Sequence, residues 1–240
     1  MQTTSALYKQ IVAGGGHWFE TRITIAGNAV PESEIISLDR ENQAMTERKP
    51  SVGGALAAQI RLTILAPSFT IPRMGEIDVF VRACNDTQQS EWLPAGVYFI
   101  DTRKHDQTAN GVGLLRLTAY DAMLKGEQDY PDTSHAWPYL DRLVVAEIAS
   151  ILSVSVDSRT NGFLTAGFLI DLPIGYTVRE TLGHIAAAYG GNFVITSENK
   201  LLFVPLYGLD PEENIVGSYL AVDGSTDALT FGNEGWYILV

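Results

Sequence analysis

A β-hairpin pattern runs through residues Ser90–Lys125, SEWLPAGVYFIDTRKHDQTANGVGLLRLTAYDAMLK. Its two arms, Val97–Arg103 and Leu114–Tyr120, are rich in the β-branched and aromatic residues that favour strands. The polar turn between the arms contains Asn110-Gly111, a pair that adopts positive φ at little cost. After the second arm, residues 120–125 turn from strand towards helix. We therefore expect this hairpin to form part of the wall of a β-barrel.

Further strands are predicted on the N-terminal side of the hairpin. A short helix within residues 4–12 precedes them, and hydrophobic alternation then predicts strands at Trp18–Ile25, Ile35–Leu38, Gln59–Leu65 and Ile77–Ala83. With the hairpin arms, the first half contains about six strands separated by turns, which is typical of an all-β sandwich or barrel. Residues 40–58 are expected to form a long polar loop between two strands, and loops of that size are usually functional or disordered.

The pattern becomes helical after Lys125. Residues 139–152 place apolar side chains three and four positions apart, which predicts an amphipathic helix. A short extended run at 154–156 and a turn at 160–162 follow. A second helix is expected to begin at Thr177, whose hydroxyl and the Glu180 carboxylate can form a capping box, and to stop at Gly190 in the left-handed conformation.

The last part of the chain is predicted to be rich in β-structure. Residues 192–196 and 201–206 alternate as a hairpin, and residues 207–235 are rich in turns. The chain finishes on the apolar run Trp236–Val240, which is expected either to pair within an oligomer or to continue in a longer protein. The predicted fold class is α+β, divided into an N-terminal antiparallel tube-type β-barrel (1–125), a two-helix segment (126–191) and a β-rich piece (192–240), possibly the start of a second barrel.

Composition limits the classes of function that fit this chain. It has 240 residues, 46% of them hydrophobic, and a formal net charge of −12. Such acidity argues against a surface that grips nucleic-acid phosphates, because those surfaces depend on Lys and Arg. Acidity fits plain solubility, and it also fits a channel through which DNA slides without specific binding. No apolar run is long enough to span a membrane and no secretory signal is visible, so we expect synthesis in a cytoplasm.

Known catalytic patterns are missing from the sequence. The single cysteine, Cys84, cannot form an internal disulfide, and the four histidines form no HExxH motif. We therefore expect no catalytic residue, no metal site and no cofactor. A pair of carboxylates such as Asp101 and Glu127 needs no motif to hydrolyse a glycoside, so that alternative stays open. The simpler expectation is that Asp101 and Arg103, on one strand face, form an ion pair or a cross-strand contact, and that Asp121 caps the turn after the hairpin.

Three stretches of the sequence, taken in order, resemble one known family. They are Pro50–Gly54 (PSVGG), the hairpin Ser90–Lys125, and Tyr176–Gly183 (YTVRETLG). Together they resemble the tail-hub proteins of tailed bacteriophages and phage-derived injection machines, a family related to the baseplate hub of contractile tails. The resemblance runs from about Leu7 to Leu206.

This resemblance implies a structural role without enzymatic activity. Members of the family look like tube-forming barrels followed by an intervening domain and a second barrel, and three copies close a ring. For this chain it implies a trimeric hub in the virion tail, made in the host bacterial cytoplasm. Its partners would be the tail tube, a distal tail protein, a spike or tip protein and a tape-measure protein, with DNA passing through. A receptor-binding or carbohydrate-binding module at the tail tip, using Trp92 or Trp137, is the other alternative.

Eight residues are expected to serve structure and assembly rather than chemistry. Five belong to the hairpin and three to the second helix: Trp92, Gly96, Asp101, Tyr120 and Asp121, and Thr177, Glu180 and Gly190.

Overall fold

The computed structural model describes residues 4–42, 51–108, 110–131 and 136–206. A short helix and a series of strands make up the first half of the chain. In chain order they are α1 (Ala6–Ala13), β1 (Trp18–Ile25), β2 (Asn28–Val30), the 3-10 turn η1 (Glu32–Glu34), β3 (Ile35–Glu41), β4 (Gly54–Leu56), β5 (Gln59–Leu65), β6 (Glu76–Cys84), β7 (Leu93–Gln107) and β8 (Gly113–Tyr120). The strands predicted from alternation are all present, and β2 and β4 were not predicted.

Seven of these strands form one antiparallel sheet, here called the barrel sheet. Their order is β2-β1-β6-β7-β8-β5-β3. The predicted hairpin is confirmed as the pairing of β7 with β8, which runs from Phe99 opposite Tyr120 to Gln107 opposite Gly113. Both arms are longer than the residue types alone indicated, because the ladder continues through the polar residues on either side of the turn.

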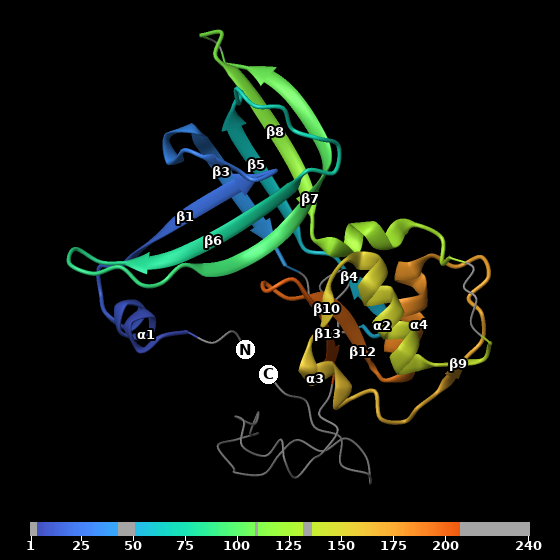
Figure 1. Ribbon diagram of the computed structural model, residues 1–240. Coiled ribbons are helices and arrows are strands. Elements are labelled where there is room, and N and C mark those ends of the chain that lie inside the picture. The colour runs from blue at the N-terminus through green and yellow to red at the C-terminus, as the bar shows by residue number, and fades with distance from the viewer. Residues whose placement is uncertain (1–3, 43–50, 109, 132–135, 207–240) are drawn as a thin grey trace, which may run out of the picture.

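The barrel sheet curls strongly but does not close on itself (Figure 1). Within the described ranges no ladder joins β2 to β3, so these two strands are its edges. The closed tube-type barrel expected from the sequence is therefore not confirmed within one chain. The curl instead buries one face of the sheet, where Ile23, Ile60, Leu62, Ile77 and Leu117 form a core with their neighbours. Burying this apolar face is the main favourable contribution to folding in this half of the chain.

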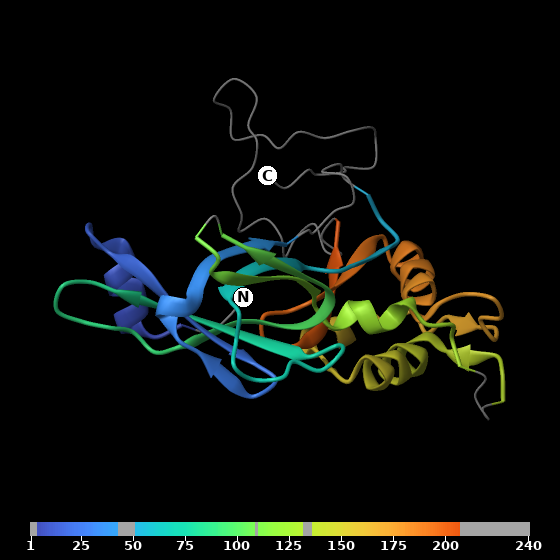
Figure 2. The ribbon, with the colours of Figure 1, turned by 90° about the horizontal axis from the view of Figure 1, so that it is seen from above.

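The second part of the structure combines helices with a small sheet. Its elements are η3 (Ala122–Glu127), β9 (Tyr139–Leu140), α2 (Asp141–Leu152), β10 (Ser155–Val156), α3 (Ser158–Asn161), β11 (Leu169–Ile170), α4 (Val178–Ala188), β12 (Gly191–Ile195) and β13 (Lys200–Pro205). Residues 122–206 and β4 are here called the helical unit. It lies beside the barrel sheet in both views (Figures 1 and 2).

Strand β4 belongs to the helical unit although it lies between strands of the barrel sheet in sequence. It pairs in parallel with β12, with Gly54 opposite Asn192 and Leu56 opposite Val194. The Asn192 side chain accepts a hydrogen bond from the Gly54 amide and donates one to the Ser51 carbonyl. The expectation of an irregular loop over residues 40–58 was therefore wrong at residues 54–56. The sequence GAL is too short to show alternation, and only its distant partner makes it a strand.

The helical unit has one hydrophobic core. Its four-stranded sheet has the order β10-β13-β12-β4, and Phe193 and Phe203 from this sheet pack with Val144, Leu182 and other buried residues of α2 and α4. Residues 192–206 therefore share a core with both predicted helices. The predicted turn at residues 160–162 is wrong, because a short helix, α3, occupies 158–161. The predictions for residues 207–240, including the run Trp236–Val240, lie outside the described residues.

Candidate functional site

The chain crosses between the two units at Ala58 and again at Asp121, and Asp121 joins the two crossings. Its carboxylate accepts hydrogen bonds from the backbone amides of Ala58, at 2.7 Å, and Met123, at 3.0 Å. The Asp121 amide in turn donates to the Ala58 carbonyl. The predicted cap is confirmed in its bond to Met123, and the bond to Ala58 adds a link between segments 63 residues apart.

Burial changes the acidity of Asp121. The residue is only 3% exposed, and removing the carboxylate from water raises its pKa from 3.8 to about 6. The two backbone amides and the positive charge of Arg179 favour the ionised form, but they only partly oppose the effect of burial. This carboxyl group serves as a buried hydrogen-bond acceptor at the point where the two units meet.

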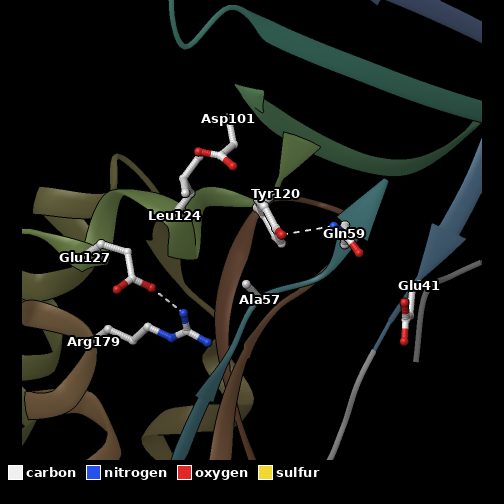
Figure 3. Close-up of a pocket in the computed structure, with 8 residues that line it drawn as sticks. All are labelled: Glu41, Ala57, Gln59, Asp101, Tyr120, Leu124, Glu127 and Arg179. Atoms are coloured by element: carbon white, nitrogen blue, oxygen red, sulfur yellow. Dashed lines mark hydrogen bonds and ion pairs between the residues drawn. The ribbon is translucent and has the colours of Figure 1, made fainter. Parts of the chain in front are cut away.

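A cleft lies next to this junction, between the barrel sheet and the helical unit (Figure 3). Its volume is about 510 Å³. We call it the junction cleft, and it is lined by Glu41, Ala57, Gln59, Asp101, Tyr120, Leu124, Glu127 and Arg179. Sequence reasoning anticipated Asp101 and Tyr120 as structural residues and Glu127 only as one member of a carboxylate pair. It missed Glu41, Gln59 and Arg179 as parts of one site, because they come from segments far apart in the sequence.

Hydrogen bonds and an ion pair hold the polar lining of the cleft. The side-chain amide of Gln59 donates a hydrogen bond to the Tyr120 hydroxyl at 3.0 Å, and Arg179 forms an ion pair with Glu127 (Figure 3). The Arg179 guanidinium also donates to the carbonyl of Ala55 in β4, at 2.7 Å. Arg179 thus ties α4 to β4 and to η3. These contacts of the lining residues thus connect β5 to β8 and α4 to β4 and η3.

The cleft does bring Asp101 and Glu127 to one cavity, as the alternative of a carboxylate pair requires. A general acid for glycoside hydrolysis is usually a carboxyl group in an apolar environment that keeps it protonated. Asp101 and Glu127 are both exposed, and Glu127 is paired with a guanidinium. The two carboxylates therefore lie in a polar, solvent-exposed site, which differs from the apolar environment that keeps a general acid protonated.

Of the two contacts expected for Asp101 and Arg103, the ion pair between them is wrong. Strand β7 shifts register against β8 between Ile100 and Thr102, so the regular alternation of faces is broken at Asp101. Arg103 instead donates to the carbonyls of Ile71 and Pro72, at 2.8 Å each. Its side chain fastens the segment between β5 and β6 to the hairpin.

The remaining hairpin residues of the predicted set have structural contacts. Trp92 stacks with the guanidinium groups of Arg22 and Arg82, which lie 4.9 and 4.5 Å from its ring centre. Gly96 has φ of +144°, and a Cβ atom there would lie 2.6 Å from the Tyr98 hydroxyl. The stacking of arginines on Trp92 leaves less of its ring for a sugar, which weakens the carbohydrate-binding alternative.

The residues predicted at the second helix occupy the conformations that the sequence indicated. Thr177 and Glu180 form the complete capping box at the start of α4, and the bonds from the Thr177 amide and hydroxyl hold the pKa of Glu180 below its ordinary value. Gly190 has φ of +67° just after the helix. These three residues define the ends of α4.

The described ranges contain neither a cluster of metal ligands nor a membrane-spanning helix. Within 4–42, 51–108, 110–131 and 136–206, no three His, Cys, Asp or Glu side chains are grouped so that they could hold a metal ion. In the same ranges no helix has the length and hydrophobicity needed to cross a bilayer. The cysteine, Cys84, is buried and free.

Comparison with known proteins finds similarity in structure only. No family model matches the sequence, and no curated protein matches it. The 43 kDa tail protein of prophage MuSo2 from Shewanella oneidensis aligns with a TM-score of 0.55 and 12% identity, over 82% of this chain and 58% of that one. A tail protein from Neisseria meningitidis MC58 aligns with a TM-score of 0.52 and 15% identity, over 77% and 51%.

This chain thus spans between half and three fifths of the length of those two proteins. The alignments include most of the chain, and so they compare the barrel sheet and the helical unit together. The described residues therefore have the fold of phage tail proteins, as the resemblance of the sequence to the tail-hub family predicted.

Proposed function

We propose that this chain is a structural protein of a phage tail or a phage-like injection machine. In this proposal it is a hub at the distal end of the tail tube, where three copies form a ring that connects the tube to the tip or spike. The observation that carries the proposal is the fold, which is shared with two tail proteins over at least 77% of this chain. The junction between the two units also supports the proposal, because the side chains of Asp121 and Arg179 hold distant backbone segments together there.

The open barrel sheet supports assembly through its edges. Strand β2 covers only residues 23–25 of β1, so Trp18–Arg22 pair with β6 alone, and β3 pairs with β5 alone. Trp18 and Phe19 on this edge are 44% and 52% exposed. Exposed strand edges readily accept another strand, so we infer that neighbouring copies meet there. In this arrangement the wall of the channel is completed by several chains.

The polar face of the barrel sheet is suited to line the channel. On β5, β8 and β7 the side chains opposite the core face include Arg61, Thr63, Arg116, Thr118 and Lys104. Twelve of the 16 Lys and Arg residues lie within residues 1–125, so the acidity of the chain is not concentrated on the barrel. In this proposal a wall of mixed charge therefore replaces the expected acidic wall that would keep DNA from sticking. A wall of mixed charge, with Arg116 paired to Asp106, binds DNA weakly because its cations are partly neutralised.

Electron microscopy and light scattering of the purified chain test this proposal. We expect rings or trimers, and we expect Phe19→Asp to shift them towards monomers by placing a charge on the β1 edge. Val112→Asp is the matched control, because Val112 is 46% exposed at the hairpin turn and away from both edges. A stable monomer at high concentration, or equal effects of the two substitutions, would count against assembly through this edge.

A tail-associated enzyme that degrades cell wall is the second candidate, because Asp101 and Glu127 line the same cleft. A peptidoglycan-release assay separates the two candidates. A hub without activity releases nothing, whereas release that is lost in both Asp101→Asn and Glu127→Gln would establish the enzyme.

A further inference from the structure

An exposed apolar segment lies on the helical unit, away from the barrel sheet. Residues Phe168–Tyr176, FLIDLPIGY, are here called the apolar loop. Four of its side chains are largely open to solvent: Phe168 is 43% exposed, Leu169 65%, Ile174 79% and Tyr176 46%. Strand β9, which pairs with the loop, lies at the end of the helical unit remote from the barrel sheet (Figures 1 and 2). Several large apolar side chains exposed on one segment mark an interaction surface.

The first end of the apolar loop is anchored by a buried carboxylate. Asp141 is fully buried, and its carboxylate accepts hydrogen bonds from the Phe168 amide and the Tyr189 hydroxyl. The Asp141 amide donates to the Phe168 carbonyl at 2.9 Å. The Phe168 ring packs on Tyr189 with 5.1 Å between ring centres. The next two residues form β11, which pairs with β9.

The second end of the apolar loop is also held in place, by contacts of Tyr176. The Tyr176 carbonyl accepts a hydrogen bond from the Tyr130 amide at 2.9 Å, and the Tyr176 ring packs edge-on against His184. Pro173 in the middle of the loop is buried. The fold therefore fixes the backbone of the loop while it leaves Leu169 and Ile174 in water. A surface held in this way loses little conformational entropy on binding.

Charge indicates which partner this surface fits. Residues 126–206 contain nine Asp and Glu but four Lys and Arg, and three of those four cations form ion pairs with Asp157, Glu127 and Glu198. Asp171 is exposed within the loop itself. At the second end of the loop Asp129, which bridges to Thr177, and Glu180, which bonds to Thr177, are exposed as well, whereas Arg142 is the exposed cation beside the first end. Among the described residues next to the loop, exposed carboxylates therefore outnumber exposed cations. A second copy meeting this surface with its own apolar loop would bring the same carboxylates to it, so self-association through this surface is opposed by like charges.

We propose that the apolar loop is a docking surface for a different protein, through a segment that combines apolar side chains with lysine or arginine. Leu169 and Ile174 supply the apolar contact, and the exposed carboxylates next to the loop select a cationic partner. This surface is separate from the strand edges through which we expect copies to assemble, so it goes beyond the proposed function and either inference can fail alone.

Synthetic peptides test the proposal with the intact chain. The probe is a fluorescent amphipathic peptide of leucine and lysine, and its counterpart has glutamate in place of lysine. We expect the lysine peptide to bind at least about tenfold more tightly by fluorescence anisotropy, because the two peptides share their leucines and the glutamate peptide alone meets like charges at this surface. Equal binding of the two peptides would overturn the choice of partner.

Substitutions distinguish docking on the apolar loop from simple attraction of the lysine peptide to the negative charge of the chain. Ile174→Asp adds a negative charge, so charge attraction alone predicts tighter binding of the lysine peptide, whereas docking on the loop predicts binding about tenfold weaker. Val112→Asp adds the same charge elsewhere and is the control. Tighter or unchanged binding in Ile174→Asp overturns the proposal. Binding of the unmodified chain to phosphatidylglycerol vesicles that is lost in Ile174→Asp would reassign the loop to membranes and also overturn it.

Discussion

Replacing Asp121 with asparagine should remove a specific part of the pH dependence of stability. The carboxyl group is 3% exposed, and burial raises its pKa from 3.8 to about 6 in the folded chain. The opposing effects at this site are unequal: burial favours the neutral form more than the amides of Ala58 and Met123 and the charge of Arg179 favour the ionised form. The folded chain therefore binds this proton more tightly than the unfolded chain does.

The sign and size of the effect follow from these two pKa values. A group whose folded pKa lies above its unfolded value contributes stability that is fully present below the unfolded pKa. That contribution is lost as the pH rises through the folded pKa. For Asp121 the loss takes place between pH 3.8 and about 6 and amounts to about 3 kcal/mol, from about 1.4 kcal/mol for each pKa unit.

Urea unfolding of the wild type and Asp121→Asn at pH 4 and pH 7 measures this contribution. Other groups titrate alike in both proteins, so the difference between them isolates residue 121. Asparagine lacks the second acceptor oxygen and should destabilise the fold at both pH values, but by about 2 kcal/mol less at pH 7 than at pH 4, because at pH 4 part of the contribution is already lost. An equal difference at both pH values refutes the raised pKa. A larger difference at pH 7 would mean that the amide donors and Arg179 outweigh burial.

Three further structural roles are tested by urea unfolding, each through the substitution of a single residue. Thr177→Ala removes the capping box of α4 and should lower the free energy of unfolding by about 1 kcal/mol; no change would mean that water replaces the cap. Gly96→Ala brings a Cβ atom to 2.6 Å from an aromatic side chain at φ of +144° and should cost about 2 to 4 kcal/mol. Gly111→Ala, at φ of +77° with open space around it, should cost about 1 to 2 kcal/mol, so equal losses would contradict the steric argument. Trp92→Leu removes two arginine contacts worth about 0.5 to 1 kcal/mol each, and Arg22→Met should then cost less in the Trp92→Leu background than in the wild type.

The features that the sequence predicted correctly depend on residues close together in the chain. Strand β5 was predicted with its exact bounds, Gln59–Leu65, because alternation and the following proline are local signals. The capping box joins residues three positions apart, Thr177 and Glu180, so its residue types alone indicate it. The same holds for the bond from the Met123 amide to Asp121.

Local patterns therefore predicted the longer strands, both long helices, the alternation that separates core from solvent and the resemblance to tail proteins, but not β2, β4 or α3. Tertiary structure alone decided that residues 54–56 are a strand, because their partner Asn192 is 138 positions away. It also decided that the barrel sheet stays open within one chain, that Asp121 is buried against Ala58, and that Phe168–Tyr176 remains exposed. The physical reason is that a hydrogen bond or burial between distant segments depends on how the whole chain packs, whereas a turn, a cap or an alternating strand is encoded within a few residues.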